Sequence, residues 1–212
     1  MKTSKFKLIA TSLLSASLLI GMGSTTFAQE AAPQQKVAEQ KAETLKVDPV
    51  HSNMLFRVKH KNSAYVFGEF YGKSGEIKYD PANPEKMSFN VEVLTDTVST
   101  GNAKRDAHLK SADFFDVKQF PKMTFKSTSV KKRGANTFTV TGDLSIHGQT
   151  KEVSTIVQMT GSMTDPKGTV TRGFYTTFNI NRTDFGMDFM VGGGISDNVK
   201  LILSIESVQE AK

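Results

Sequence analysis

The sequence predicts an all-β domain of about eight antiparallel strands, folded as a two-sheet sandwich or as a closed barrel. Apolar and polar residues alternate with a period of two from about Thr44 to the end of the chain, which indicates half-buried strands. A single segment has a helical pattern, and one helix cannot cover the apolar faces of eight strands. These faces must therefore cover each other. At eight strands, a barrel interior either fills with side chains or holds one small ligand.

The N-terminal segment has the pattern of an export signal. Lys2, Lys5 and Lys7 precede an apolar stretch at 8–20, and the small-residue pattern Thr26-Phe27-Ala28 follows it. The apolar run is shorter than the ~20 residues that a membrane-spanning helix needs. We therefore expect residues 1–28 to be a signal peptide cleaved near Ala28, and the mature protein to be periplasmic.

Residues 29–43 are polar and contain no aromatic side chain, so we expect a flexible spacer before a single domain at 44–212. Loss of the three signal lysines would lower the net charge from +6 to +3. This weak charge and the expected export argue against nucleic-acid binding. The chain has no cysteine, so its stability must come from the core rather than from disulfides.

The strand pattern is clearest between Thr137 and Ile146. Its even positions carry Phe138, Val140 and Leu144 among others, whereas its odd positions carry threonine, aspartate and serine. The same alternation recurs at 54–58, 87–93, 174–180 and 199–205.

The segment predicted as helix runs from Asn102 to Phe115, and Ser99 or Thr100 is available to cap it. Its start is polar, which is typical of a surface helix. We expect Leu109 and the two phenylalanines at its end to pack beneath it.

Four motifs carry a resemblance to a known family. They are Asp48-Pro49-Val50-His51-Ser52, the segment 101–121 with its adjacent phenylalanines, Gly142 to Gly148, and Asn181 to Gly186. In this order the motifs resemble the YceI-like family of bacterial periplasmic proteins, over nearly all of the chain after Thr44. The resemblance implies a lipocalin-like antiparallel barrel that holds a polyisoprenoid or similar lipid in an apolar interior. It thereby favours a hollow barrel, a choice that periodicity alone leaves open.

On this basis the inward apolar side chains become candidates for lipid contact, although each taken singly is also an ordinary core residue. No cofactor is expected beyond a bound polyisoprenoid or quinone-like lipid. The candidate ligand-binding residues are Phe56, Val58, Phe89, Val91, Phe114, Phe115, Phe125, Val140, Leu144, Phe174, Phe178, Phe189 and Leu203.

Polar candidates are expected at the rim of the barrel. Arg105, Asp106 and His108 could form a charge-assisted cluster that holds the helix, and Arg182 with Asp184 could brace a strand end. No pair of histidines has metal-ligand spacing, so no metal site is predicted. No nucleophile motif accompanies the rim residues, so a structural role is favoured over catalysis.

The segment 187–194 combines apolar side chains with three successive glycines, and it lacks the lysine of a phosphate-binding loop. It suits a lid, a lip that touches a membrane, or a plain mobile loop.

The resulting hypothesis is a periplasmic protein that binds a long-chain apolar lipid for carriage or storage and performs no reaction. Two alternatives stay open. One is a lipid-modifying enzyme with the rim residues 105, 106 and 108 at the cavity mouth. The other is an accessory protein that makes transient contact with the inner membrane or with a membrane redox protein.

Overall fold

The computed structural model describes residues 42–80 and 82–209. The expected signal peptide and most of the expected spacer lie outside these residues. Besides the helix α1 (Ala103–Leu109), three short 3-10 turns occur at Pro84–Lys86, Thr95–Thr97 and Arg182–Phe185. The strands are β1 (Glu43–Val47), β2 (Asn53–His60), β3 (Ala64–Phe70), β4 (Lys73–Tyr79), β5 (Ser88–Leu94), β6 (Val98–Ser99), β7 (Lys122–Gly134), β8 (Thr137–Ile146), β9 (Gln149–Thr164), β10 (Val170–Asn181) and β11 (Ile195–Gln209).

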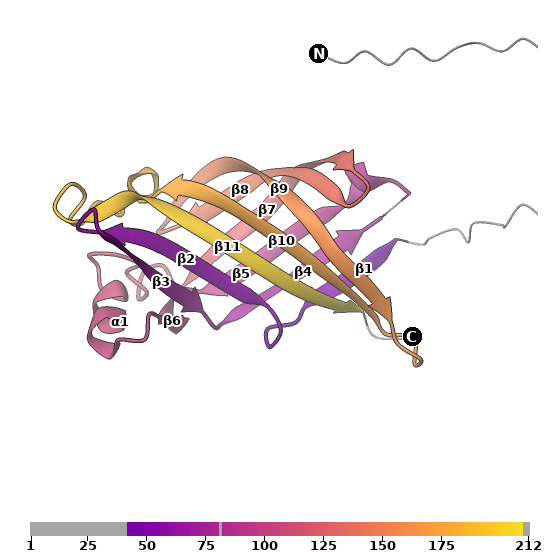
Figure 1. Ribbon diagram of the computed structural model, residues 1–212, viewed down its shortest axis with the longest axis horizontal. Coiled ribbons are helices and arrows are strands. Elements are labelled where there is room, and N and C mark those ends of the chain that lie inside the picture. Colours follow the sequence, from indigo (N-terminus) through magenta and orange to yellow (C-terminus); the bar gives the residue numbers. More distant parts are fainter. Residues whose placement is uncertain (1–41, 81, 210–212) are drawn as a thin grey trace, which may run out of the picture. The chain divides into compact units, whose positions relative to one another are not determined.

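The sheet closes on itself through the last strand (Figure 1). β11 pairs with β10 along one edge, and along its other edge it pairs first with β2 and then with β1. Val199 lies opposite Val58 of β2, and Val208 lies opposite Lys46 of β1. β1 and β2 therefore occupy a single position around the barrel as two halves of one interrupted strand.

The neighbouring strands are interrupted in the same way. β3 pairs with β2 while β4 pairs with β1, and β6 pairs with β3 while β5 pairs with β4. With these three split strands and the five continuous ones from β7 to β11, the barrel has eight antiparallel positions. The predicted all-β, lipocalin-like barrel of about eight strands with one short helix is confirmed.

Strand parity follows the sequence pattern. In β8 the even positions Phe138, Val140, Leu144 and Ile146 are buried, and the odd positions are half-buried or exposed. Alternate side chains of a strand point to opposite faces, so the buried set lines the barrel interior.

The end of the barrel farthest from α1 is filled by side chains. Leu45 and Ile77 are fully buried there, and the ring of Phe174 packs edge-on against Phe89 at 5.4 Å between centroids. Arg172, turned inward on β10, makes two hydrogen bonds to the carboxylate of Glu43, one of them 2.6 Å long. These contacts close this end of the barrel.

The helix is shorter than predicted and has a different cap. It ends at Leu109, and its first turn is capped by Asn102, whose side-chain oxygen accepts a hydrogen bond of 3.0 Å from the Arg105 amide. The predicted extension to Phe115 is wrong. Residues 110–120 form turns, in which Phe115 N donates to Leu109 O and Asp116 adopts a positive φ of 40°.

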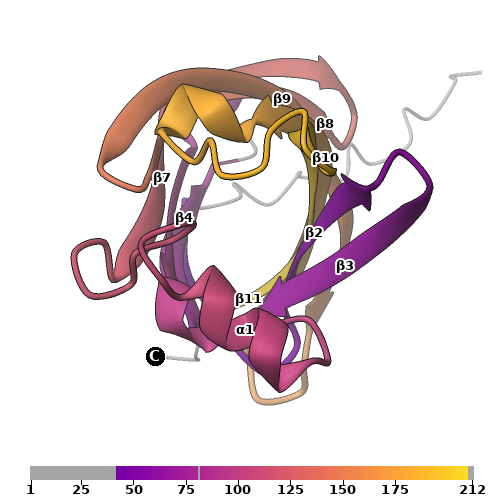
Figure 2. The same ribbon diagram turned by 90° about the vertical axis from the view of Figure 1, so that its left-hand side faces the viewer.

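α1 lies across the opposite end of the barrel, which we call the mouth (Figure 2). β3 pairs with β6 only at Glu69 and Phe70. Among the described residues, no strand lies beside the rest of this edge of β3, and α1 is next to the gap (Figure 2). The segment after β10 crosses the other side of the mouth. Within the described part of the chain, no helix has the length and apolarity needed to cross a membrane.

Candidate ligand-binding cavity

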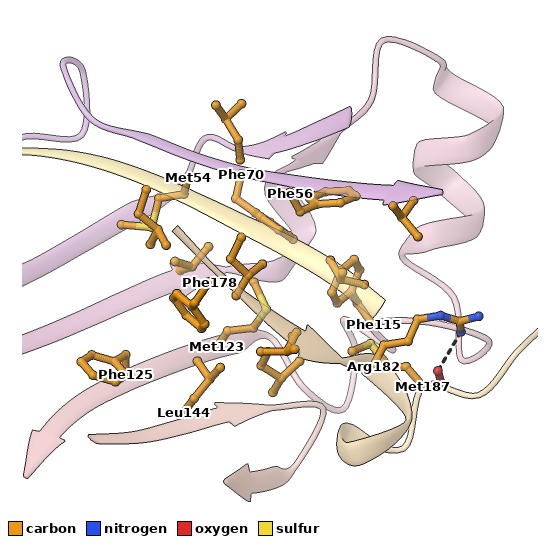
Figure 3. A pocket seen from close by; sticks show the side chains of 18 of the residues that line it. Met54, Phe56, Phe70, Phe115, Met123, Phe125, Leu144, Phe178, Arg182 and Met187 are labelled. Carbon is orange, nitrogen blue, oxygen red and sulfur yellow. Dashed lines mark hydrogen bonds between the residues drawn. The ribbon is translucent and has the colours of Figure 1, made fainter. Parts of the chain in front are cut away.

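A cavity of about 580 Å³ lies inside the barrel. This volume falls within the range of about 300–1,000 Å³ that is usual for ligand sites. Side chains from strands on opposite sides of the barrel point toward each other across it (Figure 3). All thirteen apolar candidates from the sequence belong to the lining, and their contact with a ligand stays a prediction.

Burial separates these candidates into two groups. Val140 and Phe174 are 1% and 2% exposed, so they form the packed floor of the cavity. Val58, Phe125 and Leu203 face inward and yet are only half-buried, because the cavity leaves part of their surface uncovered. An apolar ligand would gain most of its contact area from this second group.

Several lining residues were not among the candidates. Met54 and Leu201 share the inward parity of their strands and could have been included on that basis. Phe70, Met123 and Met187 carry a weaker signal, because they lie at strand ends or in a loop. Methionine is flexible and polarisable, so this part of the wall can adapt to the shape of a ligand.

Three aromatic rings meet at the mouth. His108 of α1 lies 5.1 Å from Phe114 and 5.2 Å from Phe189, and the two phenylalanine rings are 5.3 Å apart. Their edge-to-face geometry is favourable. This cluster joins the segment after α1 to the glycine-rich loop 187–194 across the opening.

The three polar residues of α1 do not form one cluster. The Asp106 carboxylate accepts hydrogen bonds from Thr100 N at 2.8 Å and Thr100 Oγ1 at 2.5 Å, which lower its pKa. Arg105 donates to the Thr100 hydroxyl and carbonyl oxygens at 2.7 and 2.8 Å. His108 pairs instead with Asp113, at 2.7 Å. Thr100, which sequence reasoning treated only as a cap, is thus the residue that anchors the helix.

Arg182 is buried and holds the loop at the mouth in place. Its guanidinium donates to the carbonyl oxygens of Met187 at 2.7 Å (Figure 3), Ser196 at 3.0 Å and Ile195 at 3.2 Å. Burial lowers the pKa of this guanidinium from its ordinary value. The expected bracing role is therefore matched by the geometry of Arg182.

Asp184, its expected companion, is exposed and does not line the cavity. The carboxylate that braces this turn belongs to Asp197, which accepts from Thr183 N at 2.9 Å and from Thr183 Oγ1 at 3.0 Å. Asp197 lies three residues after the last glycine of the run, near the start of β11, and no sequence pattern marked it as a bracing residue.

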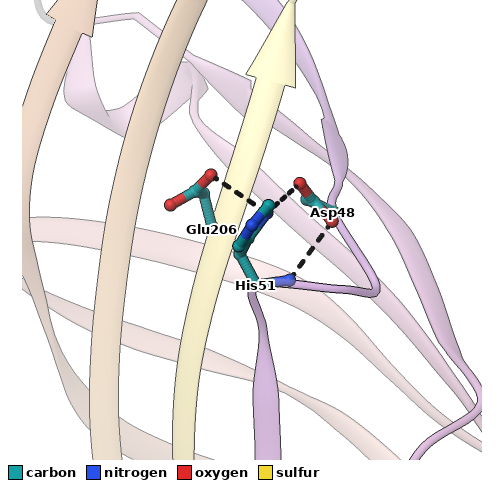
Figure 4. Close-up of side chains that lie close together, drawn as sticks. All are labelled: Asp48, His51 and Glu206. Atoms are coloured by element: carbon teal, nitrogen blue, oxygen red, sulfur yellow. Dashed lines mark hydrogen bonds and ion pairs between the residues drawn. The ribbon is translucent and has the colours of Figure 1, made fainter.

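A second polar cluster lies on the outside of the barrel, where the turn between β1 and β2 contacts β11 (Figure 4). Nδ1 of His51 is 2.7 Å from Asp48 Oδ2 and 3.7 Å from Glu206 Oε1. Ser52 fixes the same junction, since its hydroxyl accepts from Glu206 N at 3.0 Å. The first of the four family motifs is thus a clamp between β1, β2 and β11.

The hydrogen bond to Asp48, helped by the charges of Asp48 and Glu206, raises the pKa of His51. In turn, the hydrogen bond from His51 lowers the pKa of Asp48. These three side chains also place one imidazole and two carboxylates within 4.8 Å of each other, a donor set that divalent metals accept. Sequence spacing missed this group because Glu206 is distant in the chain.

The fold and the cavity define the lipocalin-like class of β-barrels, in which eight strands surround an apolar interior. The chain belongs to the YceI-like family, because the profile of the YceI-like domain matches residues 45–207.

Relatives and solved structures agree with this assignment. A UPF0312 protein of Vibrio cholerae is 38% identical over 160 residues, which cover 76% of this chain and 83% of that protein. The structure of a YCEI protein of Campylobacter jejuni has a TM-score of 0.65 and 29% identity, covering 72% of this chain and 90% of that one.

A third similar structure is a polyisoprenoid binding domain from Saccharophagus degradans. It has a TM-score of 0.61 and 15% identity, and the similarity covers 81% of this chain and 100% of that domain. At this identity the likeness concerns the fold.

Proposed function

We propose that this protein binds a long-chain isoprenoid-type lipid in the barrel cavity and serves to carry or store it. The observation that carries the proposal is the cavity itself, which is ligand-sized, almost wholly apolar and open toward α1. Membership of the YceI-like family and the polyisoprenoid-binding description of the Saccharophagus domain support it.

The free energy gained by burying the hydrocarbon favours tight binding of such a ligand. Burial of one methylene contributes about 0.8 kcal/mol, so a few isoprene units inside the cavity nominally reach a tight-binding range. Ordering of the chain and incomplete removal of water reduce this sum. Occupancy would also stabilise the fold, by about 2.7 kcal/mol when the free ligand is a hundred times its Kd.

Native mass spectrometry of gently purified protein, followed by solvent extraction, tests the proposal. We expect an apolar adduct whose removal lowers the melting temperature, and whose readdition restores it. A protein that is free of lipid, equally stable and unable to take up an added polyprenyl lipid would refute the proposal.

A matched pair of variants locates the binding. Leu203 and Ser204 are neighbours on β11, and they face the cavity and the outside respectively. Leu203→Trp would fill part of the cavity and should lower lipid uptake, whereas Ser204→Trp adds the same bulk outside and should leave uptake unchanged. Equal uptake by both variants would place the lipid elsewhere.

The geometry gives less support to a lipid-modifying enzyme. Arg105 and Asp106 are both bonded to Thr100, and His108 is bonded to Asp113, so each of the three rim residues of α1 already has a structural partner. A binding role accounts for these contacts without a reaction.

We place the protein in the periplasm on the pattern of its N-terminus, and we propose transient contact with the inner membrane or with a membrane redox protein. The outer face of β3 supports such contact, because Tyr65, Phe67 and the adjacent Tyr71 are each more than half exposed. Transfer of a fluorescent prenyl lipid from vesicles should slow in Phe67→Ser while equilibrium binding stays unchanged.

A further inference from the structure

The three side chains Asp48, His51 and Glu206, which we call the junction cluster, carry more negative than positive charge. Nδ1 of His51 faces Asp48 Oδ2 at 2.7 Å and Glu206 Oε1 at 3.7 Å (Figure 4). Among the ion pairs of residues 42–80 and 82–209, neither carboxylate has another basic partner. One imidazole therefore faces two carboxylates, and a divalent cation between them would balance their charge.

Contacts behind the junction cluster already orient its carboxylates. Oδ1 of Asp48 accepts hydrogen bonds from the amides of Val50 at 2.7 Å and His51 at 3.3 Å, which leaves Oδ2 facing the imidazole. The backbone of Glu206 is held by Ser52, whose hydroxyl accepts from the Glu206 amide at 3.0 Å and donates to its carbonyl oxygen at 3.2 Å. Supporting hydrogen bonds of this kind hold the ligands of a metal site in position.

The spacing of the three ligand atoms suits a small transition-metal ion. Bonds of about 2.0–2.2 Å from zinc to nitrogen and oxygen place the ligand atoms of a tetrahedral site about 3.4 Å apart. The observed separations of 2.7 and 3.7 Å lie on either side of this value, and all three atoms lie within 4.8 Å of one another. The His51 ring is exposed, so a small rotation of it is sufficient to reach the coordinating geometry.

We propose that the junction cluster is a metal site, in which His51 Nδ1, Asp48 Oδ2 and Glu206 Oε1 bind one Zn²⁺ ion and water completes the coordination. An imidazole ligand selects ions of the zinc type over Ca²⁺ and Mg²⁺, which prefer oxygen ligands. The ion cross-links the turn between β1 and β2 to β11, where the barrel closes. The site is separate from the proposed lipid site, because none of the three residues lines the cavity.

The test begins with purified protein that has been treated with EDTA and dialysed free of the chelator. Calorimetric titration with Zn²⁺ should show one ion bound per chain. The Tm should rise as Zn²⁺ is added, because the ion binds the folded junction and not the separated ligands. Ca²⁺ should bind at least about tenfold more weakly. Failure of Zn²⁺ to bind, or equal Kd values for the two ions, would overturn the proposal.

A matched pair of variants assigns the ion to the junction cluster. Glu206→Gln removes one ligand charge with little change of shape and should weaken Zn²⁺ binding at least about tenfold, since even supporting residues of metal sites have effects of this size. Glu152→Gln makes the same change on an exposed residue of β9 outside the cluster and should keep the wild-type Kd. The Tm without metal verifies that both variants are folded. Equal Kd values for the two variants would overturn the assignment.

A spectroscopic probe separates this site from adventitious binding to another histidine. Cu²⁺ binds such nitrogen and oxygen ligands more tightly than Zn²⁺ does, and electron paramagnetic resonance detects an imidazole nitrogen bound to it. The wild type with one equivalent of Cu²⁺ should give the signal of one imidazole, and His51→Gln should lose it. An imidazole signal that persists in His51→Gln would place the ion on another histidine and overturn the proposal.

Discussion

Strand parity in β8 predicts opposite outcomes for the same substitution at two adjacent positions. Val140 is 1% exposed and lies opposite Val130, which is 2% exposed. Thr141 points to the other face, where its hydroxyl donates to Ser154 Oγ at 3.0 Å. Val140→Lys should therefore damage the fold, and Thr141→Lys should be nearly silent.

The magnitude follows from the burial. Val140→Lys loses the burial of a valine side chain, about 1.5 kcal/mol or more, and places an ammonium group in an apolar interior at several kcal/mol. A total of about 5 kcal/mol is a large part of the 5–15 kcal/mol by which domains are typically stable. It corresponds to a fall in Tm of roughly 10–20 °C for a domain of this size. Thr141→Lys loses one exposed hydrogen bond, about 1 kcal/mol or less, hence at most about 4 °C.

Thermal unfolding of both purified variants, followed by circular dichroism, measures the difference. Lipid content per protein, determined on the same samples, should fall with Val140→Lys and stay constant with Thr141→Lys. Equal losses of Tm would show that β8 does not have one buried and one solvent-exposed face. The strand register described for β8 would then be wrong.

Three further predictions concern polar groups. His108→Ala should keep its lipid but have a lower Tm, because it loses ring packing at the mouth. Accumulation of an unprocessed lipid in this variant would instead favour the lipid-modifying enzyme. Glu43→Gln should lower the Tm measured by thermal unfolding without denaturant, because it leaves the partly buried Arg172 without its ionic partner at the closed end. An unchanged Tm would contradict that role. The raised pKa of His51 means that its pairing with Asp48 stabilises the fold below the ordinary histidine pKa and is lost as pH rises through the folded pKa. The Tm gap between wild type and His51→Asn should therefore narrow between pH 6 and pH 9, and a constant gap would refute the linkage.

The sequence was most informative where side chains obey a period of two. The parity of Val140, Phe178 and Leu203 placed all three on the cavity wall without any knowledge of strand pairing. Local contacts were harder to predict: Asn102, not Ser99 or Thr100, caps α1, because capping depends on the backbone angles at that residue.

Contacts between distant segments could not be predicted at all. Glu206 reaches His51 only because β11 runs beside the turn between β1 and β2. Arg172 breaks the apolar parity of β10, and its partner Glu43 lies 129 residues earlier, in a segment expected to be a spacer. Such pairs depend on the closure of the barrel, which no local pattern specifies.

The closed end of the barrel has a consequence for any elongated guest. Arg172, paired with Glu43, and the packed rings around Phe174 fill that side, so a chain that enters the cavity from the mouth would thread in with its apolar tip leading and withdraw in reverse. Its orientation is thereby fixed before any specific contact forms. A second protein that docks at α1 would contact the polar end of the bound lipid first. It could recognise or modify that end while the hydrocarbon tail stays shielded from water.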